Sequence, residues 1–177
     1  MQYVAFLRGM NVGGRRITND ELCDAFRSLD FEGVWAFIAS GNVVFEAETG
    51  SRSAIARRVE EGLKASLGYE VPVFLRTAKE LIGVAALDPF ADVSPPLEGK
   101  LQVAFLGKKP TAAQQKKALA FATDDDLLAI EGSQLFWQPA GNLLDSELDH
   151  AGIERALGSF TVRTHRTVER LAKKLSA

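Results

Sequence analysis

Two kinds of hydrophobic spacing alternate along the first 76 residues, and this alternation constrains the fold more than any other feature of the chain. Runs that are apolar at nearly every position, or at every second position, are typical of β-strands. Apolar residues spaced three and four positions apart are typical of amphipathic helices. In chain order the two patterns predict strand, helix, strand, strand, helix and strand, over residues 3–8, 18–29, 34–38, 43–45, 55–67 and 71–75.

The ends of these predicted elements carry their own signals. Thr18 and Glu21 have the spacing of a capping box, in which each residue satisfies a backbone amide of the first helical turn. Gly68 can end the second helix in the left-handed conformation. Gly41 and Asn42 tolerate positive φ, so the segment that joins the second and third strands is predicted to be a hairpin turn.

An element order of βαββαβ predicts an antiparallel sheet with strand order 4-1-3-2 and both helices on one face, because each crossover is right-handed. Pro72 agrees with this arrangement. Proline removes a backbone donor, which an edge strand tolerates and a central strand does not, and the fourth strand lies at an edge.

The second half of the chain repeats the order of elements. Thr77 and Glu80 form another capping box, which opens a helix that ends before a proline-rich stretch between Pro89 and Gly99. We therefore expect an α+β protein of two tandem ferredoxin-like (βαββαβ) units with antiparallel sheets, a connecting helix and a C-terminal helix. The expected divisions are 1–76, 77–100 and 101–177. This duplication is inferred from element order alone.

Composition narrows the class of protein. The chain has 177 residues, of which 46% are hydrophobic and 25% charged, enough for a substantial core. Cys23 is the single cysteine, which suits a reducing compartment, so a cytoplasmic location is expected. The apolar run at residues 3–7 is much shorter than the ~20 residues of a membrane span. A net charge of -2 gives no overall attraction to nucleic acid or to an anionic membrane.

The connection after the first strand is the sharpest candidate for a binding site. It combines Arg8, Asn11, Gly13 and Gly14 with two further arginines at positions 15 and 16. Backbone amides freed by consecutive glycines can form an anion-binding concavity ahead of a helix N-terminus. The alternative is that the glycines only allow a tight turn and the arginines are solvated.

The predicted topology brings a second loop to the same end of the sheet. Because the first and second strands run parallel, Ser40, Gly41 and Asn42 should face the loop that follows Arg8. Hydroxyl, amide and guanidinium groups at one rim suit a small polar or phosphorylated ligand. Ordinary turn chemistry is the alternative explanation of this segment.

The C-terminal segment 163–170 places three arginines and a histidine around the start of the last helix, where Thr164 can act as N-cap. Amides and arginines together favour an anion, whereas a solvated helix face is the alternative. His165 is expected to be a surface polar residue.

No cofactor or metal is predicted, because the two histidines and the cysteine lack ligand spacing and residues 124–126 lack the remainder of a calcium loop. Cys23 is expected to pack in the first helix rather than to act as a nucleophile.

These motifs together resemble the bacterial domain of unknown function 1697 family. The resemblance rests on residues 8–14 and 40–45, and on Leu157-Gly158 followed by Thr161, Arg163 and Thr167-Val168. It implies a two-part α+β fold and no known activity. It carries Arg163 and Thr167 over as candidate site residues. Where members tend to read Arg-Asn-Trp-Asn-Thr, this chain has Thr164, His165 and Arg166 between those two residues.

Three functions remain open. The leading hypothesis is a small-ligand binding module, or an enzyme whose reaction the sequence does not reveal, that holds an anionic group at the rim with Arg8 as its main charge. The second is nucleic-acid binding through the same basic rim, which predicts steep salt dependence. The third is a protein-interaction scaffold that uses an exposed sheet face or edge. The sequence does not predict the oligomeric state.

Overall fold

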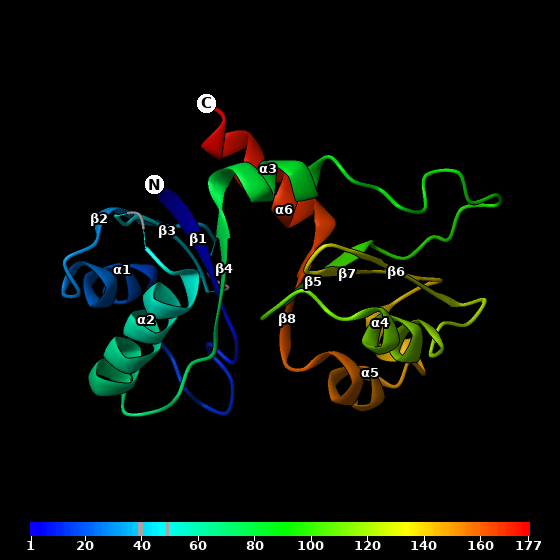
Figure 1. Ribbon diagram of the computed structural model, residues 1–177, viewed down its shortest axis with the longest axis horizontal. Coiled ribbons are helices and arrows are strands. Elements are labelled where there is room, and N and C mark those ends of the chain that lie inside the picture. The colour runs from blue at the N-terminus through cyan, green and yellow to red at the C-terminus, as the bar shows by residue number, and fades with distance from the viewer. Residues whose placement is uncertain (39–40, 49) are drawn as a thin grey trace. The chain divides into compact units, whose positions relative to one another are not determined.

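The computed structural model describes residues 1–38, 41–48 and 50–177. The chain divides into two compact units, Met1–Leu81 and Ile82–Ala177. Both are mixtures of helices and a four-stranded antiparallel sheet, and the described residues form six α-helices in all (Figure 1). The division falls inside helix α3 (Ala78–Ala85), the helix expected to connect the halves. The expected boundaries at 76 and 100 stay a prediction.

The first unit has the element order that the hydrophobic spacing predicts. Its strands and helices are β1 (Gln2–Leu7), α1 (Asn19–Arg27), β2 (Glu32–Ala36), β3 (Asn42–Glu46), α2 (Arg52–Leu67) and β4 (Val73–Thr77). The strand order is β2-β3-β1-β4, so the predicted order is confirmed and β4 lies at an edge. Pro72 directly precedes β4, and its carbonyl accepts a hydrogen bond from the Arg8 backbone amide at 3.0 Å.

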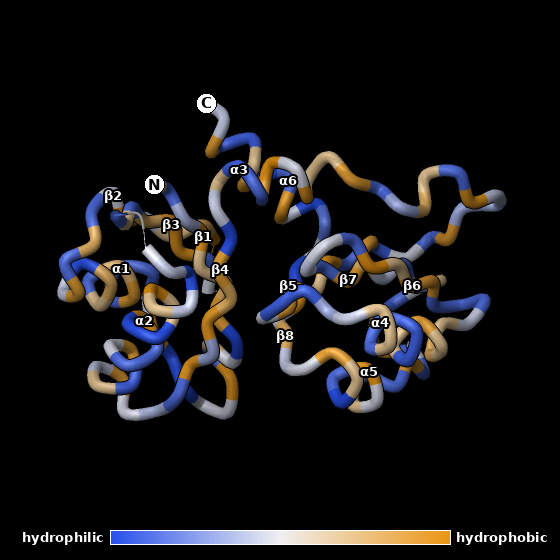
Figure 2. Tube along the Cα trace, in the orientation of Figure 1, coloured by the Kyte–Doolittle hydropathy of each residue, from blue (hydrophilic) through white to orange (hydrophobic). Residues whose placement is uncertain are grey.

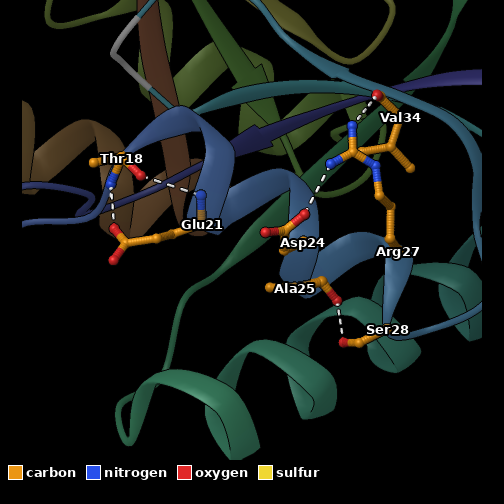
Figure 3. Close-up of polar contacts among 7 residues, drawn as sticks. All are labelled: Thr18, Glu21, Asp24, Ala25, Arg27, Ser28 and Val34. Carbon is orange, nitrogen blue, oxygen red and sulfur yellow. Dashed lines mark hydrogen bonds and ion pairs between the residues drawn. The ribbon is translucent and has the colours of Figure 1, made fainter.

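Helix α1 begins where the capping box predicts. The Thr18 hydroxyl accepts a hydrogen bond from the Glu21 amide at 3.1 Å, and the Glu21 carboxylate accepts one from the Thr18 amide at 2.7 Å (Figure 3). Near the other end, Arg27 bridges Asp24 and the Val34 carbonyl, which ties the helix to β2. The hydrogen bonds of the cap therefore fix the exit of the long loop that follows β1.

Helices α1 and α2 cover one face of the first sheet. Their apolar stripes pack with alternate strand residues into a single core, which includes Tyr3, Ala5, Leu22, Phe26, Val43, Phe45, Val59 and Leu63. Cys23 is 5% exposed in this core, as expected, and burial raises the pKa of its thiol. A buried thiol with a raised pKa is a poor nucleophile.

The second unit repeats the arrangement. Its elements after α3 are β5 (Gln102–Leu106), α4 (Ala112–Leu119), β6 (Asp126–Glu131), β7 (Gln134–Pro139), a 3₁₀ turn at Leu143–Asp145, α5 (His150–Leu157), β8 (Phe160–Thr164) and α6 (His165–Leu175). The strand order is β6-β7-β5-β8. Helices α4 and α5 pack on one face through a core that includes Ala104, Leu106, Trp137, Ile153 and Phe160.

The central strands of the two units share a four-residue sequence, which the comparison of element order alone missed. The central strands β1 and β5 both contain Val-Ala-Phe-Leu, at 4–7 and 103–106. The two copies occupy corresponding positions: Ala5 pairs with Val43 and Leu75, and Ala104 pairs with Leu135 and Val162. β1 is apolar from Tyr3 to Leu7 (Figure 2). It is buried on both faces, because its neighbouring residues Val4 and Ala5, which point to opposite faces, are both fully buried.

No helix among the described residues is both long and apolar enough to cross a membrane.

Candidate functional site

The loop between β1 and α1 adopts an unusual backbone conformation. Gly9, Asn11, Gly13 and Gly14 all have positive φ, between 56° and 82°. Side-chain-bearing residues rarely adopt this conformation, which accounts for the glycines. A Cβ atom added to any of the three glycines would meet no atom within 4 Å. The backbone at these glycines therefore borders open space, where another molecule can approach closely.

Hydrogen bonds within the loop hold this conformation. The Asn11 side-chain oxygen accepts a hydrogen bond from the Ile17 amide at 3.0 Å. Arg16 donates to the carbonyls of Asn11 and Arg15 at 3.0 and 2.9 Å. The Arg15 guanidinium lies over the Tyr69 ring, 4.0 Å from its centroid. Asn11 and Arg16 thus organise the loop, and the Arg15 guanidinium stacks on the ring of Tyr69.

Arg8 occupies the position where β1 enters this loop. Its backbone is fixed by the bond to the Pro72 carbonyl, and its side chain is half-buried. The neighbouring residue, Leu7, donates from its amide to the Gly41 carbonyl at 2.8 Å. The strand end that carries Arg8 is therefore held from both neighbouring strands.

The loop after β1 meets the β2–β3 turn, as the predicted topology requires. Gly41 is buried, and a Cβ atom at this position would lie 3.0 Å from Met10 Cγ and 3.2 Å from Leu7 Cβ. Its φ of 74° also favours glycine. Ser40 lies outside the described residues.

Asn42 is fully buried, and its amide serves the hairpin. The Asn42 side chain donates to the Phe37 carbonyl at 3.0 Å, and the Phe37 amide donates to the Asn42 carbonyl at 2.9 Å. These bonds correspond to the turn-chemistry alternative raised from the sequence. The exposed part of the rim is formed by Arg8 and by the loop with Gly13 and Gly14.

In the second unit, Arg163 lies on β8 and is largely desolvated. Its guanidinium donates to the Thr161 hydroxyl at 2.8 Å and to the Val162 carbonyl at 2.9 Å. Burial lowers the pKa of Arg163 to about 10. Thr167 lies one turn into α6, where its amide and hydroxyl both bond to the capping Thr164 hydroxyl. The predicted cap is confirmed, and both hydroxyls take part in it.

His165 is not the surface residue that the sequence suggested. Only 12% of its side chain is exposed, because its ring packs 6.4 Å from that of Phe136. Its Nδ1 lies 3.7 Å from the Glu169 carboxylate. The expectation of a surface position was wrong because the neighbouring residues are charged, although the ring of His165 packs near Phe136 of β7.

Arg76 is a buried arginine that the sequence reasoning missed. It pairs with Val4 in the first sheet as Arg163 pairs with Val103 in the second, and each is followed by the threonine that caps a helix. Burial lowers its pKa to about 10, the same direction as for Arg163. The repeated pair Arg-Thr, at 76–77 and 163–164, is the signal that could have identified it.

Two cavities lie at corresponding places in the units. One of about 510 Å³ is lined by Asp30, Glu32, Glu46 and Glu48, near the start of β2 and the end of β3. The other, of about 630 Å³, is lined by Asp125, Asp126, Asp145 and Glu147, near the start of β6 and the end of β7. Within the described part of the chain, no group of three histidine, cysteine or acidic side chains is placed to hold a metal ion.

The fold and loops define an α+β protein of two four-stranded antiparallel sheets, with a basic, glycine-rich loop at one end of the first sheet. The chain belongs to the family described as protein of unknown function (DUF1697), whose model matches residues 1–136. It is similar in structure to the conserved bacterial protein SP0830 from Streptococcus pneumoniae, with a TM-score of 0.71 and 18% identity over 99% of this chain and 98% of that one. This likeness shows the fold alone. No curated protein matches the chain.

Proposed function

We propose that the protein binds a small anionic ligand, of the phosphorylated-metabolite class, at the loop between β1 and α1. Arg8 is its main charged contact, and the backbone around Gly13 and Gly14 borders the ligand. The observation that carries the proposal is the open space in front of glycines whose loop is already ordered by Asn11 and Arg16. A preordered loop binds with a smaller entropic cost than one that must order on binding.

The charges near the loop support an anion over a cation. Arg8, Arg15 and Arg16 all belong to this segment, which contains no acidic residue in its sequence. The first acidic residue after it is Asp20, in α1. In this proposal Gly41 and Asn42 support the rim from below, and Arg163 and Thr167 remain candidate residues of the second unit.

The test is a thermal-shift screen of inorganic phosphate, pyrophosphate, nucleotides and short oligonucleotides at low and high salt. A ligand at about 100 times its Kd adds about 2.7 kcal/mol to the free energy of unfolding. We expect a salt-tolerant shift with one class of small anion, and we expect Arg8→Ala to abolish it. Arg57→Ala is the matched control, because Arg57 is exposed on α2, where it forms an exposed ion pair with Glu61.

Each other result counts against the proposal. A shift that Arg8→Ala leaves unchanged removes Arg8 from the site. A shift seen only with oligonucleotides, and lost steeply with salt, favours nucleic-acid binding through the same loop. If none of the probes raises the unfolding temperature, the result contradicts anion binding. A protein-interaction scaffold then becomes the favoured function.

We also propose that the two units are tandem ferredoxin-like repeats in a cytoplasmic protein. The shared strand orders, the two Val-Ala-Phe-Leu strands and the two Arg-Thr pairs support the repeat. The buried, unpaired thiol of Cys23 is in keeping with a reducing compartment. Cell fractionation tests the location, and recovery of the protein outside the cytoplasm would contradict it.

A further inference from the structure

We propose that the ligand of the β1–α1 loop is a mononucleotide, whose base stacks on the guanidinium of Arg15 while its phosphate lies against Gly13 and Gly14. This inference rests on the proposed function and extends it, because it names the part of the ligand that is not anionic. The feature that carries it is the stack of Arg15 on Tyr69, in which the guanidinium lies 4.0 Å from the centroid of the ring.

The Arg15 side chain is exposed and contacts the protein through the ring of Tyr69. Among the described residues, its guanidinium makes no hydrogen bond and no ion pair. One face of the planar guanidinium lies on the ring, so the opposite face is open to solvent. Guanidinium planes are among the surfaces on which proteins stack nucleobases. The outer face of Arg15 is therefore a platform of the right shape and chemistry for a base.

Tyr69 holds this platform in place. It directly follows Gly68, which ends α2 in the left-handed conformation with a φ of 82°. The ring is partly buried and packs against the core of the first unit. The guanidinium therefore rests on a fixed aromatic face, and a surface that is ordered beforehand binds with a smaller entropic cost than a mobile one.

The platform lies directly beside the glycines of the proposed anion site. Gly13 and Gly14 are the central residues of a turn that is closed by a hydrogen bond from the Arg15 amide to the Val12 carbonyl, at 3.1 Å. The two ends of such a turn lie within about 7 Å of each other. Val12 is 55% exposed and adds an apolar surface at the first end of the turn. One nucleotide can thus reach the glycine backbone with its phosphate and the Arg15 plane with its base.

A second cation–π pair of the first unit shows what distinguishes Arg15. Arg58 lies over the Phe31 ring, 4.7 Å from its centroid, near the start of β2. Its guanidinium also donates to the Leu29 carbonyl, and the cavity that it lines is acidic. Arg58 therefore serves the fold at a place that repels phosphate, whereas Arg15 belongs to a loop without acidic residues.

The single platform favours a mononucleotide over a nucleic acid. Proteins that bind single strands stack successive bases on several side chains along a basic groove. Within the described part of the chain, this loop carries one guanidinium–aromatic stack. The net charge of -2 gives no further attraction to a polyanion.

Isothermal titration calorimetry with AMP and ribose-5-phosphate tests the proposal, because the two ligands share a sugar and a phosphate and differ in the base. We expect AMP to bind at least about fivefold more tightly, the lower limit of the usual gain from stacking one base. Arg15→Lys keeps the charge but removes the plane. It should reduce the preference for AMP to less than about twofold and leave the affinity for ribose-5-phosphate nearly unchanged.

Arg57→Lys is the matched control, since Arg57 is exposed on α2, and this variant should keep the preference for AMP. Because Arg15 is exposed, we expect Arg15→Lys to fold, and an unchanged unfolding temperature without ligand checks it. Saturation-transfer NMR of bound AMP should show stronger transfer to the base protons in the wild type than in Arg15→Lys.

Failure of this inference is distinguishable from failure of the proposed function. If AMP and ribose-5-phosphate bind equally well, or if Arg15→Lys keeps the preference for AMP, the stacking is overturned and the anion site stands. If neither ligand binds and pyrophosphate does not bind either, the proposed function fails together with this inference. A short oligonucleotide that binds far more tightly than AMP overturns the mononucleotide and favours nucleic acid.

Discussion

At the scale of single residues, Glu21 has a structural role that depends on pH. Hydrogen bonds from the backbone and side chain of Thr18 lower its pKa from the ordinary value of 4.5. A group whose folded pKa is lowered stabilises the fold above its unfolded pKa, and this contribution is lost as pH falls through the folded value. The carboxylate therefore contributes at neutral pH and stops contributing in acid.

Glu21→Gln tests this role. We expect the variant to be less stable than the wild type at neutral pH, and the difference to shrink as the pH falls below the ordinary pKa of 4.5 and through the lowered pKa of folded Glu21. Urea unfolding of both proteins at neutral pH and at about pH 3 measures it. A difference that stays constant across this range would contradict the assignment. Glu131→Gln, which changes an exposed carboxylate at the end of β6, serves as the control.

The residue scale also shows what sequence reasoning misses. Thr18, Thr77 and Thr164 were identifiable as caps because the spacing of a cap is local. The burial of Arg76 and His165 was not, because it depends on strands and a ring far away in the sequence. For Asn42 the sequence left two alternatives open, ligand binding at the rim and ordinary turn chemistry, and it could not decide between them.

At the scale of elements, Gly152 decides how closely α5 approaches the segment after α4. A Cβ atom at this position would lie 2.5 Å from Phe121 Cζ and 2.6 Å from Asp149 Oδ2. Gly152→Ala should therefore destabilise the protein by about 1–3 kcal/mol, through overpacking. Helix propensity alone predicts the opposite sign, a gain of about 1 kcal/mol.

Gly83→Ala is the matched control, since Gly83 is also helical and a Cβ there meets no atom within 4 Å. Thermal or urea unfolding should show Gly83→Ala slightly more stable than the wild type and Gly152→Ala less stable. Stabilisation by both alanines would mean that Phe121 moves away at little cost. The ring of Phe121 supplies the physical reason for a glycine at this position of the helix.

At the scale of the whole molecule, element order and strand order were predictable because hydrophobic spacing and crossover handedness determine them. The two acidic cavities were not, since each is assembled from the start of one strand, the end of another and a loop. The shared strand order of the two units was predictable in outline, yet the shared Val-Ala-Phe-Leu acquires its meaning only when the registers place both copies in central strands.

The proposed repeat predicts similar energetic roles for corresponding residues. Phe6 and Phe105 are both fully buried, at the same place in their strands. Phe6→Ala and Phe105→Ala should each cost about 3–5 kcal/mol, the usual loss for a buried phenylalanine. The two losses should agree within about 2 kcal/mol, the usual spread among identical substitutions at buried sites, which differ in how far the surroundings collapse. Urea unfolding, with hydrogen exchange to identify the unit that loses protection, measures both. A much smaller cost for one phenylalanine would contradict equal roles for the two central strands, although they share the sequence Val-Ala-Phe-Leu.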